Sequence, residues 1–260
     1  MTHIMVPDGV LPWWLSVAGW LLAAALLSVA VWRVRAVPAV RMVPLAAVMT
    51  AVMVVVMSLE VVPIGYEPHL TVLTGILIGP WYGAIAAFLF NLLRALLGDG
   101  AFTNIGLNTM VTWIEIATGA GAYWALRPLL RHRRPALAAG IATVAGLFVA
   151  TLVFIGVVGV SRIDPAAAIH TGAFSVEAGG FQEGALAEGV LGVRLREHQP
   201  AGEASGHSDE WTGFARFAAA LLLLGAIGWS LEALLTGAIV AFIARVRPAL
   251  LHLPARQAAG

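Results

Sequence analysis

Long apolar stretches dominate this sequence and limit what it can fold into. They span Leu11–Trp32, Met42–Leu59, Leu70–Leu97, Thr103–Leu126, Pro135–Val160 and Thr212–Ala244. A bilayer core of about 30 Å needs roughly 20 helical residues, so most of these stretches can form one span each. Only 11% of the residues are charged, whereas soluble domains average about 25%. The sequence therefore predicts an all-α, polytopic integral membrane protein and excludes a soluble globular domain.

The first stretch is predicted to be a membrane span and not a cleaved signal peptide. No basic residue precedes it, and Arg33 and Arg35 follow it directly. Its length also exceeds the hydrophobic region of an ordinary signal peptide. We therefore expect residues 1–10 to stay attached as an extracytoplasmic arm.

Arginines supply every one of the 15 basic residues and mark the ends of the predicted spans. Ten of them form three clusters, within residues 33–41, 127–134 and 245–256. The positive-inside rule places all three clusters in the cytoplasm. They can share one side only if the stretch 70–97 crosses the membrane twice.

Gly79-Pro80 interrupts that stretch and supplies the place for a turn. We expect a short helix over 70–79 that turns at the inner side and returns through 81–97, because proline suits the first turn of a helix. A short intramembrane helix needs protein or a cavity around its ends. The prediction is about seven membrane segments, with the N-terminus outside and the C-terminus inside.

The same reasoning divides the chain into five parts. The arm is followed by membrane helices one to six in 11–160, an extracytoplasmic loop in 161–211, a seventh helix in 212–246 and a cytoplasmic tail in 247–260. The loop is acidic and rich in glycine and alanine, with few large apolar residues, so we expect it to be flexible.

Two missing residue types exclude several kinds of chemistry. The chain has no cysteine, which excludes disulfides, thiolate metal sites and cysteine nucleophiles. It also has no lysine, which a P-loop needs for the nucleotide phosphates and Schiff-base chemistry needs for its amine. The chain is therefore not expected to be a P-loop ATPase.

Two histidines are candidate metal ligands on the outer side. Thr2 is small, so removal of Met1 is expected, which leaves the Thr2 amine, the His3 amide and His3 Nδ1 as three nitrogen donors in one plane. His69 precedes the short helix and could supply a fourth nitrogen. A planar four-nitrogen site favours Ni(II) or Cu(II). If Met1 is retained, the terminus alone offers four nitrogens; alternatively, the two histidines never meet.

Other polar residues are weaker candidates. Thr103, Asn104 and Asn108 stand at the outer end of the 103–126 helix and could orient the imidazoles or simply join helices. Glu115 and Glu232 lie within spans, where a carboxyl group usually faces a partner or cavity. The remaining histidines have no ligand spacing; they are His132, His170, His198, His207 and His252.

Four segments resemble the CbiM/NikM family, the substrate-binding (S) membrane components of energy-coupling factor (ECF) transporters for cobalt and nickel. They are THIM…PDGVLP at the start, PHLTVLTGILIGPWYGAIAAF at 68–88, GDGAFTNIGLNT at 98–109 and LEALLTGAIVAFIARVRP at 231–248. The resemblance covers most of the chain except about 161–211. Its most specific part runs from His69 to Trp81.

The resemblance implies a seven-helix fold whose N-terminal segment enters a central pocket and holds the metal. The implied ligands are the amine of Thr2 or Met1, the amide and ring of His3, and His69. Two departures stand out. Thr2 intervenes where members usually begin Met-His-Ile, and the arm is about two residues longer than usual.

The resemblance also implies partners and a location. It implies a transmembrane coupling (T) component, cytoplasmic ATPase subunits and a small accessory membrane subunit, with no nucleic acid. The protein would be a multi-pass transporter subunit of the cell (inner or cytoplasmic) membrane, not an enzyme, carrying Ni(II) or Co(II) as cargo and no cofactor.

Two rival functions remain at this point. An S component for an organic micronutrient would need an aromatic pocket, for which nine tryptophans are available. A membrane-embedded enzyme using Glu115 or Glu232 would need a paired acid, base or metal motif, and the sequence contains none that we recognise.

Overall fold

The computed structural model describes residues 11–35, 39–57, 68–98, 101–130, 134–161 and 207–252. Three of the candidate metal ligands, Met1, Thr2 and His3, lie outside these ranges, and so does most of the predicted outer loop, residues 162–206. His69 and the candidate residues Thr103, Asn104 and Asn108 lie within them.

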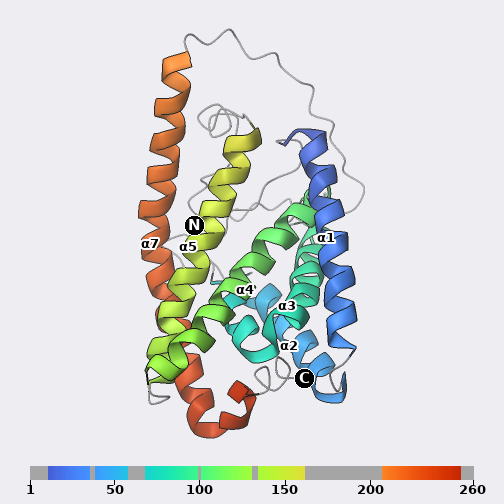
Figure 1. Ribbon diagram of the computed structural model, residues 1–260, viewed down its shortest axis with the longest axis vertical. Helices are drawn as coiled ribbons and strands as arrows, with labels where there is room; N and C mark the ends of the chain where they lie inside the picture. The colour runs from blue at the N-terminus through green and yellow to red at the C-terminus, as the bar shows by residue number, and fades with distance from the viewer. Residues whose placement is uncertain are drawn as a thin grey trace.

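The described residues form an all-α bundle without strands, which confirms the predicted fold class (Figure 1). The helices are α1 (Trp13–Val34), α2 (Ala39–Met57), α3 (Thr71–Leu96), α4 (Ile105–Leu129), α5 (Pro135–Ser161) and α7 (His207–Val246), followed by the 3₁₀ helix η1 (Pro248–His252). Most ends lie within a few residues of the predicted spans. Helix α7 starts five residues before the predicted Thr212, and therefore includes residues assigned to the loop.

Five of the described helices are long and apolar enough to cross a membrane: α1, α2, α3, α5 and the part of α7 from Leu221 to Val246. Helix α4 is of similar length, with 25 residues, but carries Asn108 and Glu115 on its buried side. It packs between α3 and α5, while α7 packs on α5 and α1 covers α3 and α4. The more polar helix is thus enclosed by the apolar ones.

The chain reverses direction inside α3, as the Gly79-Pro80 pair predicts. Gly79 has φ 78° and ψ 171°, a backbone conformation open to glycine alone. A methyl group added at Gly75 would lie 3.0 Å from Ile116 Cγ2, and one at Gly83 would lie 2.5 Å from the same atom. In a straight helix, these two positions would lie about 12 Å apart, because eight residues separate them. The two halves of α3 therefore fold back toward each other. Counting the two halves of α3 separately gives seven helical segments besides η1 in the described ranges.

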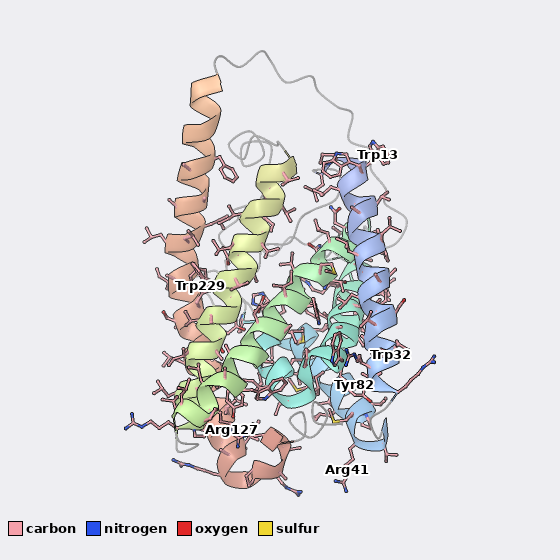
Figure 2. All side chains as sticks on the ribbon, viewed as in Figure 1. Trp13, Trp32, Arg41, Tyr82, Arg127 and Trp229 are labelled. Carbon is pink, nitrogen blue, oxygen red and sulfur yellow. The ribbon has the colours of Figure 1, made fainter. Side chains whose placement is uncertain are left out.

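The arginine-bearing helix ends gather at one end of the bundle. The end of α1, the start of α2, and the ends of α4 and α7 all lie at the lower end in Figure 1. Figure 2 shows Arg41 and Arg127 there, with Trp13 at the opposite end. Arg127 Nη1 donates to the Leu251 carbonyl at 3.2 Å, which joins α4 to η1. The bundle therefore has the one-sided arrangement that the arginine clusters predict, and its orientation in a membrane remains a prediction.

Exposed tryptophans mark both ends of α1. Trp13 is 78% exposed and Trp32 is 66% exposed. Nineteen residues of helix separate them by about 28 Å, which matches the thickness of a bilayer core. Such aromatic residues favour the two membrane–water interfaces.

The short first half of α3 lies in the middle of the bundle. Every residue from Pro68 through Gly79 is buried. Close packing is possible because glycines face this segment: a methyl group at Gly119 of α4 would lie 2.6 Å from Val72, and one at Gly146 of α5 would lie 3.1 Å from Val72. This segment therefore begins deep among α4, α5 and α7.

Candidate metal site

His69 lies among residues 68–70, which directly precede α3 in the part of the chain that the structure describes, and its exposed fraction is 0%. The next residue, Leu70, has φ 55° and ψ 24°, and it is the one described non-glycine residue in the left-handed region. A bulky residue adopts this conformation at a cost, so the surroundings must hold it. The turn at Leu70 places His69 at the head of a buried helix.

Glu232 of α7 holds both His69 and Leu70. Its Oε2 lies 3.4 Å from His69 Nδ1, and its Oε1 accepts a hydrogen bond from the Leu70 backbone N–H at 3.1 Å. Glu232 is 0% exposed. A carboxyl group that contacts the ring of a histidine restricts its orientation, so α7 helps to hold the imidazole in place.

Glu115 of α4 meets the same turn of α3 from another side. The Thr71 hydroxyl donates to Glu115 Oε1, and the Thr74 hydroxyl donates to the Leu70 carbonyl at 2.9 Å. Carboxyl groups are favourable near a helix N-terminus, where the backbone N–H groups carry partial positive charge. Two buried glutamates from two helices therefore secure the start of α3.

The other predicted site residues belong to the start of α4. Asn104 Oδ1 accepts a hydrogen bond from the Ser16 hydroxyl at 2.7 Å, and the Thr103 carbonyl accepts one from Trp20 Nε1 at 3.0 Å. Both contacts tie α4 to α1. Asn108 is buried and stands two helical turns, about 10 Å, from Glu115. Its predicted role beside the imidazoles remains a prediction.

His69 supplies one nitrogen donor. Within the described ranges, no three histidine, aspartate or glutamate side chains lie together as ligands for a metal ion. The two glutamates have partners at the helix start, a role that was predicted for neither of them. The signal that could have found Glu232 is its place within an apolar span, where a carboxyl group is costly unless it is paired.

Comparisons with known proteins agree with this architecture. The family model described as "Cobalt uptake substrate-specific transmembrane region" matches residues 3–250. No curated protein matches. A solved structure described as a truncated transition metal transporter has 19% sequence identity and a TM-score of 0.64, and covers 93% of this chain and 99% of its own.

A second solved structure, described as a transition metal transporter, also has 19% identity. Its TM-score is 0.65, and the match covers 94% of this chain and 93% of that one. At this identity the two structures show a shared fold. The family match over nearly the whole sequence shows more: the chain belongs to the CbiM family and is a multi-pass transmembrane component of transition-metal uptake.

Proposed function

We propose that this protein is the metal-binding S subunit of an ECF-type ABC transporter that imports Ni(II) or Co(II). The observation that carries the proposal is His69, which is completely buried and whose ring contacts Glu232 of α7. A buried histidine oriented by a carboxyl group has the features of a metal ligand. Its position ahead of a buried intramembrane helix supports binding in the interior of the bundle.

The proposed ligands are nitrogen atoms. His69 contributes one ring nitrogen, His3 contributes its ring and backbone amide, and the terminal amine of Thr2, or of Met1 if it is retained, completes the set. Imidazole and amide nitrogens suit Ni(II) and Co(II), whereas Mg²⁺ and Ca²⁺ prefer oxygen ligands. The donor set therefore favours transition metals over the abundant hard cations.

Three further residues would support the imidazoles from the outer end of α4. Asn108 is buried on the same side of α4 as Glu115, seven residues away. Asn104 is held by Ser16, and Thr103 by Trp20. In this proposal they help to orient the ligands and do not bind the metal.

Energy for import would come from other subunits, because the chain has no lysine for a P-loop. The proposed partners are a transmembrane coupling (T) component, cytoplasmic ATPase subunits and a small accessory membrane subunit, all in the cell (inner or cytoplasmic) membrane. The family match as an uptake component supports this division of labour.

Equilibrium metal titration of the purified protein tests the proposal. The N-terminus of the sample should be sequenced first, so that the terminal donor is known. We expect one tight site for Ni(II) or Co(II) in the native protein and its loss in His69→Ala. Tight binding that survives His69→Ala would refute the proposed ligand set.

A further inference from the structure

We propose that Glu232 is a positioning residue of the metal site, which selects the His69 tautomer that presents Nε2 to the metal. This inference rests on the proposed role of His69 as a ligand. It goes further, because it assigns the selection of the ligating atom to a residue on another helix, 163 positions away in sequence.

The backbone contact determines how the carboxyl group is used. Leu70 N–H can only donate, so Glu232 Oε1, 3.1 Å away, must accept. The second oxygen, Oε2, is then directed at His69 Nδ1 at 3.4 Å. With the ring proton on Nδ1, His69 donates to Oε2 and carries its lone pair on Nε2. A metal is therefore bound through Nε2.

The same carboxyl group also holds the turn that carries the ring. Leu70 adopts φ 55°. Without Glu232, its buried N–H would lose the carboxyl oxygen that accepts its hydrogen bond. Because both oxygens contact adjacent residues, the ring and the backbone are fixed together. Metal ligands placed in this way need little rearrangement on binding, which preserves affinity.

Replacement of Glu232 by glutamine tests the tautomer with little change of shape. The fixed Leu70 N–H selects the amide oxygen as its partner, so the amide NH₂ must face His69 Nδ1. The ring then has to accept at Nδ1 and carry its proton on Nε2, which blocks the metal-binding lone pair. Glu232→Gln should therefore lower metal affinity although the side chain keeps its size.

Glu115→Gln is the matched control. Glu115 is also a buried carboxyl group in a central helix, but its contact is with the Thr71 hydroxyl and not with His69. A hydroxyl can donate to the oxygen of glutamine as well as to that of glutamate. This variant removes a buried carboxyl group and should leave the His69 tautomer unchanged.

Nitrogen-15 NMR of histidine side chains in the metal-free protein reads the tautomer directly, with His69→Ala identifying the His69 signals. We expect the Nδ1–H form in wild type and in Glu115→Gln, and the Nε2–H form in Glu232→Gln. Titration with Ni(II) should show a loss of about 10–100-fold in affinity for Glu232→Gln, and a clearly smaller loss for Glu115→Gln, which keeps the His69 tautomer.

Three outcomes would overturn the inference. One is an Nε2–H form of His69 in the wild-type protein, a measurement that does not depend on whether Glu232→Gln folds. The second is wild-type affinity in Glu232→Gln while His69→Ala loses the site. The third is an equal loss in Glu115→Gln and Glu232→Gln. If His69→Ala itself binds tightly, the proposed function fails instead, and the tautomer spectra still report on Glu232.

Discussion

The backbones of Gly19 and Gly106 meet where α1 crosses α4. A methyl group added at Gly106 would lie 2.6 Å from the Trp20 backbone nitrogen and 2.7 Å from the Gly19 carbonyl carbon. The hydrogen bond from Ser16 to Asn104 and the one from Trp20 to Thr103 lie beside this crossing. Close approach of small residues is how helices associate in a membrane, where lipid is as apolar as the side chains.

Gly106→Ala should therefore destabilise the fold. The methyl group cannot be accommodated without moving backbone, and overpacking of this kind costs about 1–3 kcal/mol. We expect a lower midpoint of unfolding in detergent. Gly121→Ala is the control on the same helix, because a methyl group there has nothing within 4 Å. Equal stability of the two variants would show that α1 is not held at this crossing.

The central hairpin could be predicted from sequence because two independent signals agree. Arginine clusters require an extra crossing, and Gly79-Pro80 provides the turn. The ends of the helices were harder to predict from sequence. The first residues of α7, from His207, are polar and lie outside the apolar stretch that hydropathy detects. Helix formation there does not depend on the long apolar stretches from which the spans were predicted.

The site was predictable only in part. His69 stands out because it precedes a helix that must be covered by protein. Its contact with Glu232 joins residues 163 positions apart, and no local spacing encodes such a pair. The contact between Thr71 and Glu115 depends on the close packing of α3 and α4 through Gly75 and Gly119. Both glutamates were visible as carboxyl groups in spans, but their partners are set by tertiary packing.

Single-cysteine labelling will test the orientation of the protein in the membrane. Each label reports on one position, because the chain has no native cysteine. Cysteines replacing Tyr66 and Gly100 should both react with an impermeant reagent from outside, because α3 enters and returns. A cysteine replacing His132, beside the arginines that follow α4, should react only after the membrane is opened. Opposite accessibility at 66 and 100 would show that α3 crosses only once.

An extension of a few residues ahead of Met1 should abolish metal retention. It removes the free amine from the proposed ligand position and adds bulk where the arm must enter. The extension leaves the sequence of every membrane helix unchanged, so we expect expression and folding to be retained. Metal content per protein checks this, and equal content in extended and native-terminus samples would exclude the terminus as a ligand.

Acidification should release the bound metal. Protons compete with it for the terminal amine, the two imidazoles and the His3 amide, so affinity falls as pH falls. Metal retained after dialysis over a pH series measures the effect. Release that is unchanged between neutral and acidic pH would argue for ligands that do not take up protons in this range.

The histidine variants separate direct ligands from supporting residues. His3→Ala removes an imidazole and the chelate ring that positions the amide, and His69→Ala removes one donor from the interior. Both should abolish tight binding in equilibrium titrations. Asn108→Ala should lower the affinity by only about 10–100-fold, as expected for a residue that orients a ligand.

The matched comparison is a triple alanine variant of histidines assigned to the outer loop from sequence. They are His170, His198 and His207. Because these residues lack ligand spacing, the variant should keep the affinity of the central site, although weak additional binding could disappear. His69→Ala should lose that site under the same conditions. The reverse result, with the tight site lost in the triple variant and kept in His69→Ala, would place the metal on the outer loop.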